Sequence, residues 1–164
     1  MWLAYPAGLI KDSRLLDASP HGVTPEETIE IARGYDFVAL YTSTPGFKND
    51  VKLAEMMKAA KPDLKLAFVG PPVTSQPDQA LNASAAIDFI VRKEIDYPLA
   101  EFAEGHPLDS IQNVSFRKDG KIVHNSERPP LHELDSLPWA SEVYKRDLDI
   151  TKYNVPFLLN PYIS

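Results

Sequence analysis

Four short apolar runs recur along the chain at intervals of about 22 to 27 residues, each followed by a polar turn and a helix-like segment. Runs that are nearly continuous in apolar residues are typical of strands buried on both faces. Strands of this kind that alternate with helices form a parallel sheet covered by helices on both sides. The sequence therefore predicts an α/β fold with a doubly wound, mostly parallel sheet. The four runs are Arg14 to Ala18, Phe37 to Thr42, Leu64 to Val69 and Asp88 to Arg92.

The segments between the runs carry helix signals. Thr24-Pro-Glu-Glu27 is a capping box with proline at the first helical position, which predicts a helix that ends near Arg33. Its stop signal is Gly34, since glycine commonly follows the last helical residue. Apolar spacing and proline or glycine boundaries predict further helices over residues 49–61, 77–83 and 97–104.

Both ends of the chain depart from this pattern. Trp2 to Ile10 has a proline in its middle, so a short helix or an irregular packing segment is expected there. A doubly wound domain normally opens with a central strand, and we therefore expect an upstream first strand to be missing. Near the other end, Val114 to His124 alternates on either side of Asp119-Gly120, which predicts a β-hairpin over 113–124.

The chain after the hairpin is rich in proline and charge and has little periodicity, which indicates a connecting segment. Pro156 to Ser164 then begins a new apolar segment. We therefore expect an α/β domain over residues 1–125, followed over 126–164 by a linker and the start of a further, absent domain.

Composition excludes several classes of function. The sequence has no cysteine, so this stretch supplies no disulfide, cysteine nucleophile or iron–sulfur ligand. Its formal net charge of −6 and its lack of a dense basic cluster argue against a nucleic-acid partner. No apolar run is long enough to span a membrane, and no signal peptide is apparent, so we predict a cytoplasmic protein.

Ligands of open parallel sheets bind at the carboxyl ends of the strands, near the point where the strand order reverses. The glycine motifs of dinucleotide and nucleotide phosphate sites do not occur. The hydroxyls after the second run, beside Gly70 and Thr74, would instead suit a bulky ligand with amide and nucleotide arms, although the same residues are typical of ordinary turns. The predicted cofactor-binding residues are Ser19, His21, Thr42, Ser43, Thr44, Gly70, Pro71, Pro72, Thr74 and Glu94.

Catalytic and metal-ligating sets are not apparent in the same loops. No nucleophile, base and orienting residue occur together, so no catalytic residue is predicted. His21 is the only histidine in this loop layer, and a lone histidine is more often a loop or packing residue than a metal ligand.

In order along the chain, several segments resemble the amino-terminal cobalamin-binding region of B12-dependent radical SAM enzymes. The resemblance covers nearly the whole chain, and Trp2 to Gly22 with Tyr153 to Ser164 looks most like the branch associated with hopanoid biosynthesis. The anaerobic magnesium-protoporphyrin monomethyl ester cyclases have a similar layout. The segments that carry the resemblance are Leu15–Ala18, Tyr35–Thr42, Phe68–Thr74, Asp88–Glu94, Val114–Val123 and Leu134–Pro138.

The resemblance implies a Rossmann-like cobalamin-binding fold with cobalamin across the strand ends. It also implies a downstream barrel of the same polypeptide, in which three cysteines hold a [4Fe-4S] cluster that cleaves S-adenosylmethionine. The whole enzyme would then act on a lipid-type hopanoid substrate, and this chain alone would be catalytically silent.

Two departures from the pattern keep other hypotheses open. Asp17 and His21 are four residues apart, whereas cobalamin mutases place the cobalt-ligating histidine two residues after the aspartate, so histidine ligation of cobalt does not carry over. Gly70-Pro71-Pro72 stands where relatives often have a glycine pair and a histidine. A docking domain that has kept the fold and lost the ligand is therefore an alternative, and a flavodoxin-like or receiver-like domain is a third.

Overall fold

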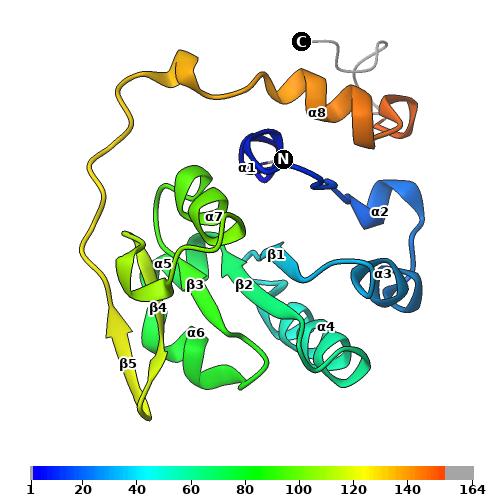
Figure 1. Cartoon of the computed structure of the whole chain (residues 1–164). Helices are drawn as coiled ribbons and strands as arrows, with labels where there is room; N and C mark the ends of the chain where they lie inside the picture. The colour runs from blue at the N-terminus through cyan, green and yellow to red at the C-terminus, as the bar shows by residue number, and fades with distance from the viewer. Residues whose placement is uncertain (1, 154–164) are drawn as a thin grey trace.

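The fold is built on a five-stranded mixed sheet, seen in a computed structural model that describes residues 2–153 (Figure 1). β1, β2 and β3 are parallel, and β4 and β5 continue the sheet in antiparallel orientation. The predicted α/β class is confirmed, whereas the apolar segment expected from Pro156 onwards lies outside the described residues. The strands are β1 (Phe37–Tyr41), β2 (Lys65–Val69), β3 (Phe89–Val91), β4 (Val114–Lys118) and β5 (Lys121–His124).

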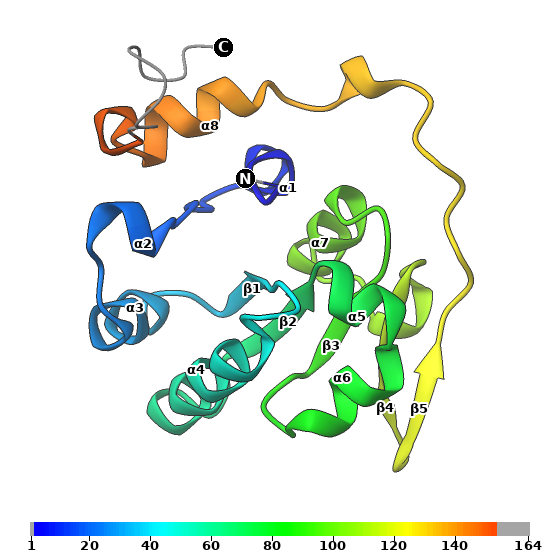
Figure 2. The ribbon, with the colours of Figure 1, turned by 180° about the vertical axis from the view of Figure 1, so that it is seen from behind.

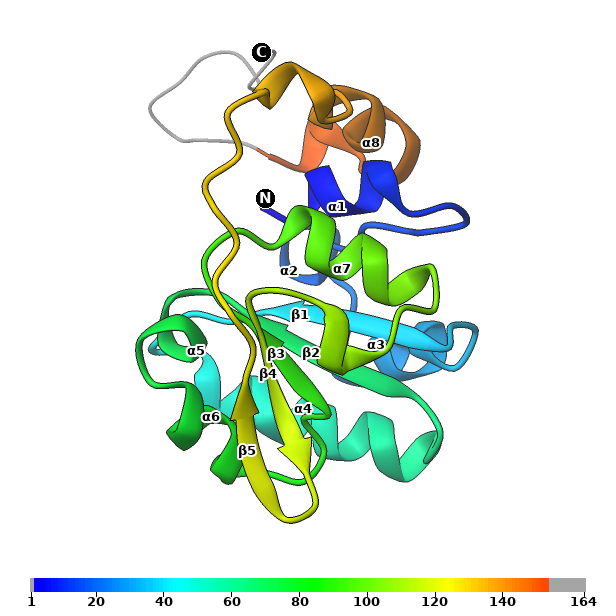
Figure 3. The same cartoon turned by 60° about the vertical axis from the view of Figure 1, so that its left-hand side comes forward.

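Helices cover both faces of the sheet, as the doubly wound class predicts. Figures 1 and 3 show α4 and α6 on one side of the strands and α7 on the other. The α-helices are α1 (Ala4–Leu9), α2 (Ala18–His21), α3 (Pro25–Ala32), α4 (Phe47–Ala60), α5 (Pro71–Ser75), α6 (Pro77–Ala83), α7 (Asp96–Ala103) and α8 (Ala140–Asp147). Three 3₁₀ turns accompany them in the described part of the chain: η1 (Leu108–Ser110), η2 (Leu134–Ser136) and η3 (Ile150–Lys152).

The core consists of one apolar cluster on each face of the sheet. Phe68 of β2 and Ile90 of β3 pack against α4, α5 and α6, and both are fully buried. On the opposite face, Val69 and Phe89 pack against α7. Every residue of β3 is buried, which confirms the prediction that these runs are covered on both sides. β1 differs, because its residues are half-buried or exposed.

Local sequence signals are confirmed where they are strongest. The Thr24 hydroxyl accepts a hydrogen bond from Glu27 N–H, and the Glu27 carboxylate accepts one from Thr24 N–H, so the capping box starts α3. Asp119 and Gly120 have φ values of 50° and 74° and form the turn between β4 and β5. The segment at Trp2 to Ile10 contains the short helix α1, as expected.

One prediction about local structure is wrong. Arg14 to Ala18 is not a strand, because Leu15 N–H donates to the Asp147 carboxylate (2.7 Å) and the Leu15 side chain packs against Val143 of α8. The strands of the described sheet run in chain order, so no reversal of strand order within this sheet marks a binding point. Helix α5 was not predicted: Pro71 and Pro72 occupy its first two positions, where helices leave N–H groups unused.

A third layer lies above α7 and is formed by the two ends of the described chain. α1 packs between α7 and α8 in Figure 3, and Ala4, Ala7 and Val143 form its small apolar core. The region read as a connecting segment thus includes α8, which contacts α1. Among the described residues, no helix combines the length and the hydrophobicity that crossing a membrane would need.

Candidate functional site

The carboxyl ends of β1 and β2 are in close backbone contact through Thr42 and Gly70. Gly70 has φ +121°, and a Cβ atom placed on it would lie 2.2 Å from the Thr42 carbonyl oxygen. Only glycine allows this approach. The Thr42 side chain is fully buried and its hydroxyl donates to the Asp50 carboxylate (2.6 Å) at the start of α4. Thr42 and Gly70 therefore form a closely packed floor.

Polar side chains surround this floor at the same edge of the sheet. Ser43 and Thr44 are exposed after β1, and the Ser43 hydroxyl accepts a hydrogen bond from Gly46 N–H (3.3 Å). After β2, the Thr74 hydroxyl accepts a hydrogen bond from Lys93 N–H (3.2 Å), which connects this loop to the turn after β3. We call the set Ser43, Thr44, Thr74, Lys93 and Glu94 the strand-end rim.

A cavity of about 350 Å³ opens beside the last residue of the strand-end rim. It lies between the first turn of α7 and the segment 128–133, and its lining includes Glu94, Asp96 and Tyr97. The phenol of Tyr97 is within hydrogen-bond distance of the Ser136 hydroxyl (2.9 Å), farther along the same segment.

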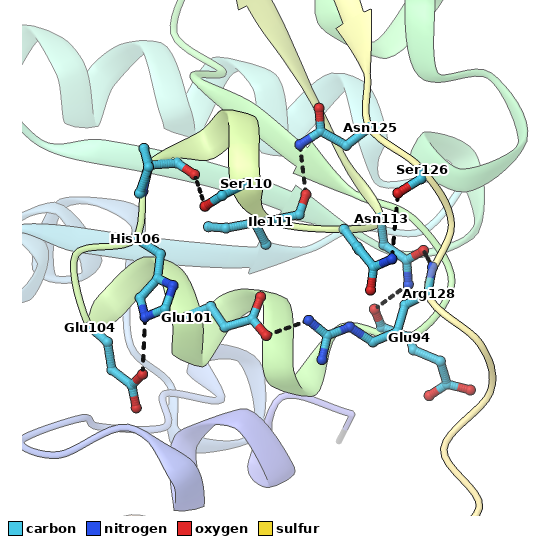
Figure 4. Close-up of polar contacts among 12 residues, drawn as sticks. Glu94, Glu101, Glu104, His106, Ser110, Ile111, Asn113, Asn125, Ser126 and Arg128 are labelled. Atoms are coloured by element: carbon cyan, nitrogen blue, oxygen red, sulfur yellow. Dashed lines mark hydrogen bonds and ion pairs between the residues drawn. The ribbon is translucent and has the colours of Figure 1, made fainter.

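Asn113 and Arg128 hold the two walls of this cavity in place (Figure 4). Asn113 is fully buried with φ +64°, donates from Nδ2 to the Glu94 carbonyl oxygen (3.2 Å) and accepts from Arg128 N–H (2.8 Å). The Arg128 guanidinium pairs with Glu101 of α7 and lies over the Tyr97 ring. Sequence reasoning missed both residues; the only available signal was an asparagine just before a strand, since asparagine tolerates positive φ.

Among the ionisable groups that line this cavity, Asp96 has the clearest change of pKa. Burial, and then the neighbouring charge of Glu94, raise the pKa of the Asp96 carboxyl from 3.8 to about 6. A raised carboxyl pKa means that the folded protein binds this proton more tightly than the unfolded chain does. Asp96 therefore lowers stability above about pH 6, and the penalty disappears as the pH falls towards 4.

We expect Asp96→Asn to stabilise the protein at pH 7 by about 1 kcal/mol, a value reduced because solvent screens a half-buried group. The gain should vanish near pH 4, where the wild-type carboxyl is protonated in the folded state. Urea unfolding of both proteins between pH 4 and 7 measures the difference. As a control of opposite sign, Asp109→Asn should be destabilising at neutral pH, because the hydrogen bond from Lys118 lowers the pKa of Asp109. A gain for Asp96→Asn that does not change with pH would contradict the prediction.

The predicted residues Ser19 and His21 lie elsewhere, on α2, which Figures 1 and 2 place away from α5. His21 Nδ1 donates to the Asp17 carbonyl oxygen (2.8 Å), and Nε2 accepts from Asp149 N–H (2.9 Å). Burial, and then the hydrogen bond that its phenol donates to the Asp17 carboxylate, raise the pKa of Tyr153. α2 is therefore held by the segment that follows α8.

The structure thus divides the predicted residues into two groups. Thr42, Ser43, Thr44, Gly70, Pro71, Pro72, Thr74 and Glu94 share the carboxyl edge of the parallel strands. A second cavity, of about 420 Å³, lies along β1 and is lined by neither the 42–44 nor the 70–74 residues. In the part of the chain that the structure describes, no three histidine or acidic side chains are grouped closely enough to hold a metal ion.

Comparisons with known proteins find similarity over the part of the chain that contains this edge. The model of a family described as B12 binding domain matches residues 1–103, a span that contains α1 to α7 and the whole strand-end rim. The chain is also 24% identical over 148 residues to an uncharacterized methyltransferase of Pyrococcus horikoshii, covering 85% of this chain and 32% of that protein. The chain therefore spans about a third of the length of this curated relative.

Proposed function

Since the chain belongs to the B12-binding domain family, we propose that it is a cobalamin-binding module whose cofactor lies against the strand-end rim. The observation that carries the proposal is that the family match spans the three parallel strands and the polar residues at their carboxyl ends. Open sheets bind their ligands at this edge.

The residues at this edge suit the chemistry of cobalamin. A corrin ring is broad and carries amide side chains around its periphery, so it needs a flat support and groups that both donate and accept hydrogen bonds. The close contact between Thr42 and Gly70 supplies such a floor, because Gly70 has no side chain that would project from it. Ser43 and Thr44, which follow Thr42 directly, are exposed, and their hydroxyls can both donate and accept hydrogen bonds.

In this proposal Ser43, Thr44 and Thr74 hydrogen-bond the amides of the cofactor. Glu94 lies on both the rim and the cavity of about 350 Å³, so it can accept a hydrogen bond from an arm that enters this cavity. Pro71 and Pro72 lack N–H groups, so these two positions contribute shape rather than hydrogen bonds. Bound cobalamin would supply a cobalt centre able to carry an alkyl group or an electron.

His21 does not suit the role of cobalt ligand. Both of its ring nitrogens already form hydrogen bonds within the chain, to Asp17 and Asp149. A metal bond at Nε2 would displace the Asp149 N–H, and α2 would have to leave the segment after α8. We therefore propose that the lower face of the corrin receives no ligand from His21.

Titration of the protein with hydroxocobalamin tests the cofactor assignment. We expect a saturable change in the visible spectrum, and we expect the double substitution Ser43→Ala/Thr44→Val to weaken binding about tenfold. Two lost neutral hydrogen bonds of about 0.5 to 1.5 kcal/mol each would account for that loss. Ser84→Ala is the matched control. It also removes a hydroxyl, but Ser84 precedes β3 and therefore lies towards the amino ends of the parallel strands, away from the strand-end rim.

Three results of this titration would count against the proposal. No spectral change at high micromolar cobalamin would favour a docking domain that has lost the ligand. Equal losses for the rim and Ser84 variants would place the cofactor elsewhere. A changed spectrum of the bound cofactor in His21→Ala would restore His21 as a ligand, whereas we expect that spectrum to stay the same.

We further propose that the whole protein is a B12-dependent radical SAM enzyme that acts on the side chain of a hopanoid-type lipid. Support comes from the resemblance of the segments quoted above and from the methyltransferase relative, whose name is compatible with a cobalamin module in a longer enzyme. Anaerobic purification of the full polypeptide, with iron and sulfide analysis, tests the first part. Four irons per chain, lost when closely spaced cysteines after this region are replaced, would support it, and their absence would refute it.

The substrate assignment requires a separate experiment on the same full polypeptide. Incubation with S-adenosylmethionine, a reductant and a hopanoid lipid should convert the lipid, as seen by mass spectrometry. Conversion of magnesium-protoporphyrin monomethyl ester instead would favour the cyclase-like alternative.

A further inference from the structure

The cavity of about 350 Å³ is covered on one side by an extended segment of the chain. We call residues 129–137 the strap. They belong to the connection between β5 and α8, which Figures 1 and 3 show as an extended segment that contains the short turn η2. Pro129, Pro130 and Leu131 of the strap line the cavity, and Tyr97 lines it from α7. The strap therefore spans a cavity where a packed loop would contact α7 directly.

Few interactions hold the strap along its length. Within the described chain, residues 129–135 form no hydrogen bond or ion pair with a residue outside the strap. Pro129 and Pro130 have no backbone N–H to donate. Leu131 and Leu137 are half-buried, and the other residues of the strap are exposed. Segments with few buried apolar contacts and few hydrogen bonds open locally at a low cost in free energy.

The two ends of the strap are fixed. Before it, Arg128 N–H donates to the buried Asn113 side chain (2.8 Å), and the Arg128 guanidinium pairs with Glu101 (Figure 4). After it, Pro138 packs so closely against α1 that a Cβ atom on Gly8 would lie 2.5 Å from the Pro138 Cγ atom. The strap can therefore move away from α7 as a loop between two fixed points, and the layer of α1 and α8 stays in place.

One hydrogen bond joins the strap to the wall of the cavity. The Tyr97 phenol oxygen lies 2.9 Å from the Ser136 hydroxyl oxygen. The single proton of the Ser136 hydroxyl is directed to the Glu133 carbonyl oxygen (2.6 Å), so Tyr97 is the donor and Ser136 the acceptor. This neutral hydrogen bond is weaker than the charge-assisted pair of Arg128 with Glu101. Because Tyr97 also lines the cavity, a group that enters the cavity reaches the same phenol.

We propose that the strap is a lid over this cavity, held closed by the Tyr97–Ser136 hydrogen bond and opened to admit an arm of the cofactor. The inference rests on the proposed function, because it assigns the route by which that arm reaches Glu94. Opening exposes Leu131 to solvent, and closing buries it again, so the accessibility of position 131 measures the state of the lid. The alternative is a rigid strap, with a cavity that is reached only from the strand-end rim.

A single cysteine on the strap measures the opening without any cofactor. The sequence has no cysteine, so Leu131→Cys creates the only thiol of the protein. Its reaction with N-ethylmaleimide should be slower than that of His132→Cys, because His132 is already exposed. Adding Tyr97→Phe should make the Leu131→Cys reaction about two- to tenfold faster, the factor that corresponds to one neutral hydrogen bond. The reaction of His132→Cys should stay the same.

The chain offers a matched control for the acceptor of this hydrogen bond. η1 and η2 have the same sequence, Leu-Asp-Ser, and both Ser110 and Ser136 donate to the carbonyl oxygen three residues earlier. Ser136→Ala should therefore accelerate the Leu131→Cys reaction as Tyr97→Phe does, whereas Ser110→Ala should not. The double variant Tyr97→Phe/Ser136→Ala should be no faster than either single variant, because both substitutions remove the same contact.

Binding kinetics of the cysteine-free variants connect the lid to the cofactor. In stopped-flow mixing with hydroxocobalamin, Tyr97→Phe and Ser136→Ala should associate faster than the wild type by the factor found for the thiol, because association follows the open fraction of the lid. No binding by the wild type would refute the proposed function and, with it, the role of the lid. Normal binding with thiol rates that respond to neither substitution, or with unchanged association rates in both variants, would refute the lid alone.

Discussion

Gly70→Ala should destabilise the protein by about 3 kcal/mol or more, because two penalties coincide at this position. Gly70 has φ +121°, a backbone conformation that alanine rarely adopts. The new Cβ atom would also lie 2.2 Å from the Thr42 carbonyl oxygen, a backbone atom that cannot rotate away. The carboxyl ends of β1 and β2 would have to separate, which would also disturb the floor under the strand-end rim. Urea unfolding measures the loss.

Gly22→Ala is the matched control for this prediction. Gly22 also has positive φ, +66°, but among the described residues, apart from its chain neighbours, no atom lies within 4 Å of the position its Cβ would take. Its substitution should therefore cost only about 1 to 2 kcal/mol, the price of the left-handed conformation alone. Equal losses for the two variants would show that the contact with Thr42 is not the constraint inferred here. Cobalamin titration of both proteins should show weakened binding for Gly70→Ala only.

Phe68→Ala should cost about 3 to 5 kcal/mol of unfolding free energy. Phe68 of β2 is fully buried and packs edge-to-face against Phe47 of α4, with ring centroids 6.1 Å apart. Truncation would remove the ring from the larger apolar core and leave a cavity that the surrounding strands cannot fill. Chemical denaturation with a constant m-value would show that the loss is one of stability rather than of compactness.

Met56→Ala provides the comparison on the surface of α4. Met56 is 45% exposed, so its truncation should change stability by no more than about 0.5 kcal/mol. Losses of similar size for Phe68→Ala and Met56→Ala would contradict the assignment of Phe68 to the core.

Local signals predicted the parts of the fold that depend on neighbouring residues. The capping box at Thr24 and the turn at Asp119-Gly120 are complete within a few residues, and the structure has both. The continuous apolar runs of β2 and β3 were likewise sufficient, because burial on both faces leaves a pattern in the run itself.

Features that depend on distant residues were not predictable in the same way. Leu15 belongs to an apolar run that is typical of a strand. Its backbone N–H, however, donates a hydrogen bond to the carboxylate of Asp147, which is 132 residues away. Asn113 shapes the cavity beside Glu94 through contacts with two separate loops. The sequence located the polar residues of the carboxyl edge but not the cavity next to them, because its walls come from α7 and the segment 128–133.

The layer formed by α1 and α8 has a consequence for how the chain is made. Its hydrogen bonds join Leu15 to Asp147, His21 to Asp149 and Asp17 to Tyr153, across separations of 132, 128 and 136 residues. Such distant contacts form late, since the long intervening loop must close first. On the ribosome, the sheet can therefore assemble while the amino-terminal helices still lack their partner, and a nascent chain at that stage exposes apolar surface to chaperones.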